Sequence, residues 1–174
     1  MRWARRIALA EIVWCAGLLA ASTLVGGIPL PTPIVMSAFL LALPILGVPV
    51  IAAERLQIRE TGRVSAGGYW LWRLLRETMS GRLLIASWLL FVGFWVVGAL
   101  SMGSPSVQEW GAGTYAAQIH GQWTVISKAR YLPLKAQGQR VFLSVPGGLC
   151  VAAAVLSTAL LRREERREAV RPKS

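Results

Sequence analysis

The stretch LLIASWLLFVGFWVVGALSM, from Leu83 to Met102, contains twenty residues without a charge or a proline. At a rise of about 1.5 Å per residue, a helix of this length is about 30 Å long, which matches the hydrocarbon core of a bilayer. A helix satisfies its own backbone hydrogen bonds in lipid, whereas an isolated strand cannot. The stretch therefore predicts a membrane-spanning helix, and we interpret the other long apolar runs in the same way.

Three further apolar runs complete the predicted bundle. Residues 7–25 follow the basic start MRWARR, and we interpret them as an uncleaved helix because no clear small-residue cleavage site precedes the turn. Residues 34–53 contain Pro44 and Pro49, which predict a kinked helix. Residues 141–161 include a Pro-Gly-Gly sequence, which predicts a break, and then small residues that let another helix approach closely.

The composition leaves little material for a separate soluble module. The chain has 174 residues, of which 55% are apolar and only 16% are charged. A chain of this length forms one domain, because domains have about 100–200 residues. We therefore expect a single domain of the all-α membrane class, residues 1–174, with four transmembrane helices at about 7–25, 34–53, 83–102 and 141–161.

The loop of residues 54–82 is polar and basic, and it contains the stretch YWLWRLLRETM. On a helix at about 100° per residue, most apolar side chains of this stretch lie on one side, with Arg73 and Arg76 opposite. Tryptophans such as Trp70 and Trp72 are enriched at the level of the lipid headgroups, and the arginines would be attracted to anionic lipid. We predict an interfacial amphipathic helix anchored by these four residues. The alternative is a frayed first turn of the third span.

Residues 103–140 form the predicted outward loop. Its middle, TYAAQIHGQWTVIS, alternates loosely and places His120 and Gly121 between two strand-like runs. A glycine at this turn position favours a short β-hairpin of residues 115–119 and 122–126.

The segment after this hairpin allows two interpretations. Ser127 suits a helix N-cap, so a helix can begin at Lys128 and continue into the fourth span. Pro133 opposes this, because it would remove a hydrogen bond from the early helix. Both a longer fourth helix and an irregular outward loop therefore remain open.

Basic residues are distributed unevenly between the connections. Three precede the first span, none separates the first two spans, six lie in residues 54–82, four in residues 103–140 and six after the fourth span. Loops on the cytoplasmic side carry an excess of Lys and Arg. We therefore expect a multi-pass protein of the cell inner membrane, with both termini in the cytoplasm and the loop around His120 outside.

Glu11 is the only acidic residue in a predicted span. Such residues are functional candidates, because an ionised carboxyl in hydrocarbon costs several kcal/mol. Glu11 also lies only about 6 Å past the start of its span, where a side chain can reach the interface and the helix N-terminus favours an anion. A proton or partner site and a structural role at the interface are both open.

The outward region supplies the other candidate functional residues: His120, Trp123 and Tyr131. His120 is the sole histidine, so one chain cannot assemble a metal site from several histidines, and a turn residue is the alternative reading. Cys15 and Cys150 fall at mid-depth of the first and fourth spans, where they can be neighbours. Their apolar surroundings favour small buried hydrophobic residues over a redox pair.

Several function classes find no support in the sequence. No GxGxxG, P-loop, HExxH or GxSxG motif occurs, and all eight acidic residues are glutamate, so few groups are left to act as acid, base and nucleophile. The net charge of +11 lies at the ends of apolar runs, so we expect no nucleic acid partner. We accordingly predict no catalytic residue, no metal and no cofactor, with a membrane-embedded enzyme as a minor alternative.

The segment from His120-Gly121 through Val125-Ile126-Ser127, Tyr131 and Arg140-Val141-Phe142 resembles a pattern in small, uncharacterised actinobacterial integral membrane proteins. The resemblance covers about a fifth of the chain. It implies a bacterial inner-membrane protein with an outward hairpin before its last helix, and it implies no activity. The Arg- and Ala-rich, Lys-poor composition agrees with a bacterial source of high GC content.

We expect the protein to sit in the lipid bilayer and to act by binding another protein, as an accessory subunit or an immunity-type protector. The small-residue helix faces and the outward loop would carry this contact. A second hypothesis is a small transporter or lipid-handling protein that uses Glu11 and the proline-interrupted helices.

Overall fold

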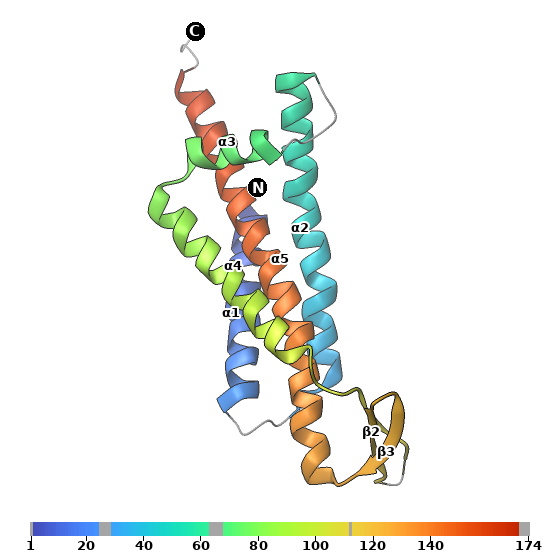
Figure 1. Cartoon of the computed structure of the whole chain (residues 1–174). Helices are drawn as coiled ribbons and strands as arrows, with labels where there is room; N and C mark the ends of the chain where they lie inside the picture. Colours follow the sequence, from blue (N-terminus) through green and yellow to red (C-terminus); the bar gives the residue numbers. More distant parts are fainter. Residues whose placement is uncertain (1, 25–28, 63–67, 112, 171–174) are drawn as a thin grey trace.

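The computed structural model describes residues 2–24, 29–62, 68–111 and 113–170. Within these residues the chain forms five helices and one small antiparallel sheet (Figure 1). In chain order the elements are α1 (Arg2–Leu24), α2 (Thr32–Thr61), α3 (Gly68–Thr78), α4 (Gly81–Ser101), β1 (Val107–Glu109), β2 (Tyr115–Ile119), β3 (Gln122–Ile126) and α5 (Lys128–Val170). We name the two ends of the bundle the α3 end and the sheet end after the elements that lie there.

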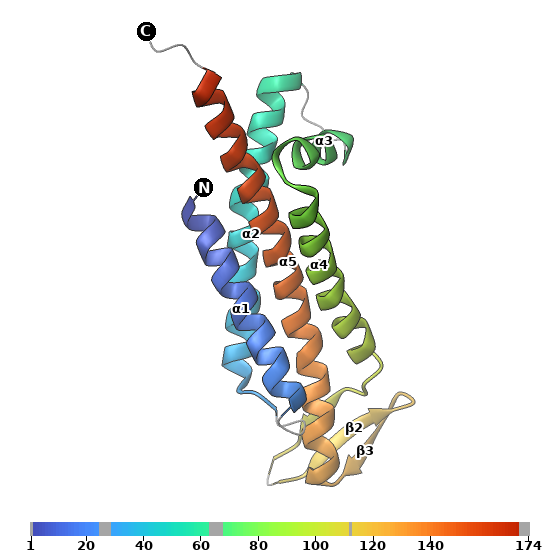
Figure 2. The same cartoon turned by 90° about the vertical axis from the view of Figure 1, so that its left-hand side faces the viewer.

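Four helices, α1, α2, α4 and α5, are long and apolar enough to cross a membrane. Each contains nearly all of one predicted span, and the amphipathic stretch forms the separate short helix α3. This helix lies across the bundle, whereas the four long helices run along it (Figures 1 and 2). Leu74 and Thr78 of α3 are buried while Tyr69 and Arg73 are exposed, so its predicted amphipathic character is confirmed.

Helix α5 is the centre of the bundle, because α1, α2 and α4 each pack along it (Figure 2). In the apolar window of α5, 61% of the residues are buried, against 11% in the apolar window of α4. The main core draws side chains from all four long helices, among them Ala8, Ala38, Phe94 and Ala153. Most of the apolar surface of α4 therefore points away from the bundle.

Glycines let α4 and α5 approach closely. A Cβ atom at Gly147 would overlap the ring of Phe94, which is 5% exposed. A Cβ atom at Gly148 would lie 3.3 Å from Nε1 of Trp95. The aromatic side chains of α4 thus occupy the space that these two glycines leave open on α5.

The prolines do not interrupt the helices. Helix α5 is continuous over its whole length, although Pro133 and Pro146 lie inside it. The predicted break at the Pro-Gly-Gly sequence is therefore wrong. Helix α2 also continues through Pro44 and Pro49, and the kink expected there stays a prediction. Each proline removes a single helical hydrogen bond, and the contacts of α5 with three neighbouring helices offset that loss.

The predicted hairpin is confirmed, with β2 and β3 paired antiparallel and with His120 and Gly121 at the turn. Strand β1, for which the sequence shows no strand pattern, pairs with the other edge of β2 and completes a sheet of order β1-β2-β3. Of the two interpretations of the segment after the hairpin, the longer helix is confirmed, because α5 begins at Lys128 and continues through Pro133. The carbonyl of Ser127 accepts the first hydrogen bonds of this helix, as its predicted capping position requires.

Two side chains of α5 bind the end of α1 and Leu30, which precedes α2. The Leu30 N–H donates to Oε1 of Gln139, and Nε2 of Gln139 donates to the Leu30 carbonyl, both over 2.8 Å. Arg140 donates from Nη2 to the carbonyl of Ser22 over 2.7 Å. The end of α1 and the residues before α2 are thereby fixed at the level of these two residues on α5.

Candidate functional site

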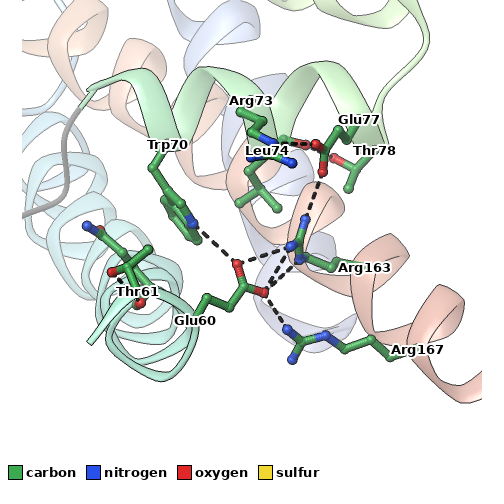
Figure 3. Close-up of polar contacts among 10 residues, drawn as sticks. Glu60, Thr61, Trp70, Arg73, Leu74, Glu77, Thr78, Arg163 and Arg167 are labelled. Carbon is green, nitrogen blue, oxygen red and sulfur yellow. Dashed lines mark hydrogen bonds and ion pairs between the residues drawn. The ribbon is translucent and has the colours of Figure 1, made fainter. Parts of the chain in front are cut away.

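A polar network joins α2, α3 and α5 at the α3 end (Figure 3). Its centre is the carboxylate of Glu60, in the last turn of α2. Arg163 donates to this carboxylate from Nε and Nη2, each over 3.0 Å, and Arg167 donates from Nη2. Trp70 of α3 adds a hydrogen bond from Nε1 over 3.3 Å. Because the Glu60 side chain is only 17% exposed while those of Arg163 and Arg167 are 26% and 55% exposed, these charge-assisted bonds are partly shielded from water.

The same network reaches Glu77 of α3. Arg73, one turn earlier on α3, donates from Nε over 2.7 Å, and Arg163 donates from Nη1 over 3.1 Å. The hydrogen bond from Arg73, and to a smaller extent the one from Arg163, hold the pKa of the Glu77 carboxyl below its ordinary value of 4.5. Arg163 therefore bridges the carboxylates of α2 and α3.

The last turn of α3 is capped by two further arginines of α5. Arg162 donates from Nη1 to the carbonyl of Thr78 over 3.1 Å, and Arg166 donates from Nη1 to the carbonyl of Glu77 over 2.7 Å. The last carbonyls of a helix have no partner within it, so these bonds stabilise the end of α3. The basic run after the fourth span is therefore a structural clamp and not only a solvated tail.

The four predicted interfacial anchors lie on α3 but are not gathered into one site. Trp70 is half-buried against Glu60, and Trp72 is 56% exposed. Arg73 forms the ion pair with Glu77, and Arg76 is exposed. Their contact with a membrane stays a prediction.

At the sheet end, aromatic rings fix the sheet to α5. Tyr131 of α5 is 4% exposed, and its ring centroid lies 4.5 Å from that of Tyr115 in β2. The Nζ atom of Lys135 lies 5.3 Å from the Tyr131 ring, within the range of a cation–π contact. The predicted candidate Tyr131 thus joins the sheet to the helix.

The opposite face of the sheet carries exposed apolar side chains. Trp110 and Trp123 pack together with 5.9 Å between their ring centroids, yet they are 50% and 41% exposed. Val125 is 63% exposed and lies on the same face of β3 as Trp123, because side chains two apart on a strand point the same way. We define Trp110, Trp123 and Val125 as the outer patch.

His120 occupies the hairpin turn and is exposed. Its φ of 51° and the φ of 82° at Gly121 are both positive, as a two-residue turn of type I′ requires. Histidine adopts this conformation more readily than most residues other than glycine. The position of His120 is therefore accounted for by the geometry of the turn.

Glu11 is buried in the bundle, with 8% of its surface exposed. Its Oε1 atom accepts a hydrogen bond from the Cys15 thiol, one turn later on α1, over 3.8 Å. In the part of the chain that the structure describes, no basic side chain forms an ion pair with Glu11. Cys15 and Cys150 are both free, fully buried and members of the same core cluster.

Sequence reasoning missed several residues of these clusters. Glu60 stands among alternating charges that gave no pattern, and its two arginine partners lie about one hundred residues later. Trp110 follows a strand of only three residues. The one available signal was the density of arginines after the fourth span, which exceeds the need of a stop anchor. One of them, Arg167, pairs with Glu60.

No protein family, curated protein or solved structure matches this chain. Within the described residues, no group of three His, Cys, Asp or Glu side chains could hold a metal ion. The class of this protein is therefore described from its fold alone. It is a helical bundle with four helices suited to a membrane, a clamped amphipathic helix at one end and a small aromatic sheet at the other.

Proposed function

We propose that this chain is a multi-pass protein of the bacterial inner membrane, with the α3 end in the cytoplasm and the sheet end outside. The excess of basic residues around both termini and residues 54–82 supports this orientation. Helix α4 has 21 residues, so its length of about 32 Å suits the hydrocarbon core. An amphipathic helix that lies across the end of the bundle suits the membrane interface (Figure 1).

The function that we propose is the binding of another protein outside the membrane. The single observation that supports it most strongly is the outer patch, in which two large indole rings stay exposed on a sheet that is fixed to α5. Tryptophan side chains are enriched among the residues that contribute most to protein–protein binding. The protein would not catalyse a reaction but would act as an accessory subunit or an immunity-type protector.

The position of the outer patch argues against lipid as its main contact. Gln139 lies at the level of Leu30, two residues before the start of α2. Tyr131, which supports the sheet, precedes Gln139 by eight residues and so lies about 12 Å farther out along α5. The headgroup layer is about 5–8 Å thick on each side. The sheet accordingly lies beyond the ends of α2 and α4 (Figure 1).

The partner that suits this surface presents apolar side chains. The outer patch contains no charged residue, and neither does the whole of β3, QWTVI. Strand β3 is also an edge of the sheet, so its outward backbone groups are available to a strand of the partner. A charged or strongly hydrated surface would leave the two indole rings without a matching contact.

A second candidate function is proton-coupled transport or lipid handling through Glu11. The burial of this carboxyl, with only a thiol as its partner in the described residues, favours it. The substitution Glu11→Gln should then abolish the cellular phenotype that depends on the gene without lowering the abundance of the protein. An unchanged phenotype would remove the main reason for this candidate.

Photo-crosslinking in intact cells tests the proposed protein binding. A photoreactive phenylalanine analogue in place of Val125 should give a protein adduct of one discrete mass, and combined alanine substitution of Trp110 and Trp123 should abolish it. The same analogue in place of Arg130, which is exposed on the first turn of α5, is the matched control and should give no adduct. Lipid adducts alone at position 125, or equal protein adducts at both positions, would contradict the proposal.

The proposed orientation has its own test. A cysteine in place of Val125 should react with a membrane-impermeant maleimide on spheroplasts, whereas one in place of Glu165 should react only after lysis. The native thiols give little background, because Cys15 and Cys150 are fully buried. The reverse pattern of labelling would invert the topology and place the outer patch in the cytoplasm.

A further inference from the structure

A groove of about 490 Å³ lies between α2 and α5 at the α3 end. Its inner part is apolar and includes Val48 and Ile51 of α2 and Leu160 of α5. Its rim carries four arginines, two from each helix: Arg55 and Arg59 of α2, and Arg163 and Arg167 of α5. One groove therefore combines an apolar floor with a basic entrance.

The entrance carries positive charge that the protein does not neutralise. The two α5 arginines pair with Glu60, and Arg163 also pairs with Glu77 (Figure 3). Among the described residues, Glu164 is the one carboxylate that lines the groove. Arg55 and Arg59 are exposed, and within the described residues they form no ion pair. With Arg73, which also pairs with Glu77, five guanidinium groups stand against the three carboxylates of Glu60, Glu77 and Glu164, so two positive charges are left to attract an anion.

The order of residues along α2 indicates the shape of this anion. Val48, Ile51, Arg55 and Arg59 line the same groove, so one face of α2 changes from apolar to basic over eleven residues, or about 16 Å. A guanidinium group binds a phosphate through two parallel hydrogen bonds. Basic pockets between transmembrane helices on the cytoplasmic side suit anionic lipid headgroups, and the apolar floor suits an acyl chain.

The position of the groove along the bundle also agrees with a bound anionic lipid. Its basic entrance is next to Glu60, whose carboxylate also binds the indole N–H of Trp70 on the amphipathic helix α3. A tryptophan on such a helix belongs at the level of the headgroups. The four arginines are therefore at the depth where lipid phosphates lie, and the apolar floor extends from there toward the middle of the bundle.

We infer that this groove binds an anionic phospholipid, with its phosphate between the arginines of α2 and α5 and one acyl chain along Val48 and Ile51. The inference depends on the proposed insertion in a membrane but not on the protein partner at the sheet end. A bound lipid of this kind would neutralise the entrance and join α2 to α5 beside the network of Glu60.

The test uses the full chain, purified in a mild detergent, and native mass spectrometry. The probes are phosphatidylglycerol, phosphatidylcholine with the same acyl chains, and inorganic phosphate. The double substitution Arg55→Gln with Arg59→Gln removes two charges from the groove. The matched control, Arg2→Gln with Arg6→Gln, removes two charges from exposed residues of α1 outside it.

Phosphatidylglycerol should bind the wild type and the α1 control at least about tenfold more tightly than phosphatidylcholine, and the α2 variant should lose this preference. Retention of the preference by the α2 variant, equal losses in both variants, or displacement of the lipid by inorganic phosphate would each overturn the inference. If the α2 variant does not fold, the lysine substitutions Arg55→Lys and Arg59→Lys keep the charge but lose the paired hydrogen bonds. They should weaken binding several-fold, and unchanged binding would also overturn it. Incorporation of the protein into nanodiscs reports membrane insertion separately.

Discussion

The packing of α4 on α5 can be tested with two glycines of the same helix. A Cβ atom at Gly147 would overlap the ring of Phe94, whereas nothing lies within 4 Å of a Cβ atom at Gly138. Both residues are inside α5, so alanine should improve helix propensity equally at the two positions. Any difference between Gly147→Ala and Gly138→Ala therefore reports the contact with α4.

The expected magnitudes separate the two variants clearly. Gly138→Ala should stabilise the fold by about 0.5–1 kcal/mol, since it reduces the conformational freedom of the unfolded chain. Gly147→Ala gains the same amount but forces Phe94 out of its place, and overpacking of this kind costs about 1–3 kcal/mol. The two variants should then differ by about 1–3 kcal/mol, which is a factor of about 5 to 150 in the unfolding equilibrium.

Equilibrium unfolding in mixed detergent micelles, followed by tryptophan fluorescence and circular dichroism, measures this difference. Combining Gly147→Ala with Phe94→Leu should remove most of the penalty, because the smaller side chain leaves room for the new methyl group. Equal stabilisation by Gly138→Ala and Gly147→Ala would refute the reasoning. It would mean that α4 does not pack on α5 at this position.

Three further predictions concern the two ends of the bundle. Glu60→Gln should lower the free energy of unfolding by about 1–2 kcal/mol, because it removes partly shielded ion pairs. It should also raise the rate of amide hydrogen exchange in α3, and an unchanged exchange pattern would contradict this. Because the pKa of Glu77 is lowered from 4.5, its ion pairs stabilise the fold above that pH and lose this effect as the pH falls through the lowered pKa. The free energy of unfolding should therefore fall on acidification more in the wild type than in Glu77→Gln, and parallel curves would count against it. Gln139→Ala should lower the free energy of unfolding by about 1–3 kcal/mol, because its two hydrogen bonds to Leu30 are lost. Gln137→Ala, two residues earlier and on a different face of α5, should have little effect in the same unfolding assay.

Local patterns predicted the elements well. The uncharged stretch from Leu83 to Met102 and its three counterparts became the four long helices, and the amphipathic stretch became α3. The hairpin followed from the pair His120 and Gly121, since the turn demands positive φ at both residues. Each of these features depends on residues that are close in sequence.

The candidate site was predicted only in part. Trp123 was identified as a candidate, but its partner Trp110 was not, because the strand before Trp110 gains its conformation from pairing with β2. The arginines of α5 were seen as a stop signal, yet their positions are set by Glu60, about a hundred residues earlier. Contacts of this kind leave no periodic signal in the chain.

By itself, the sequence determined how many segments are apolar enough for a membrane, where the basic residues separate them, and where the chain turns back in a hairpin. These properties depend on composition and on short-range backbone preferences. Only the tertiary structure decided that α5 is the centre of the bundle, that α4 is its most exposed helix, and that the prolines leave the helices unbroken. The physical reason is that hydropathy measures the transfer of a side chain out of water, whereas the choice of neighbour depends on fit, such as the space that Gly147 leaves for Phe94.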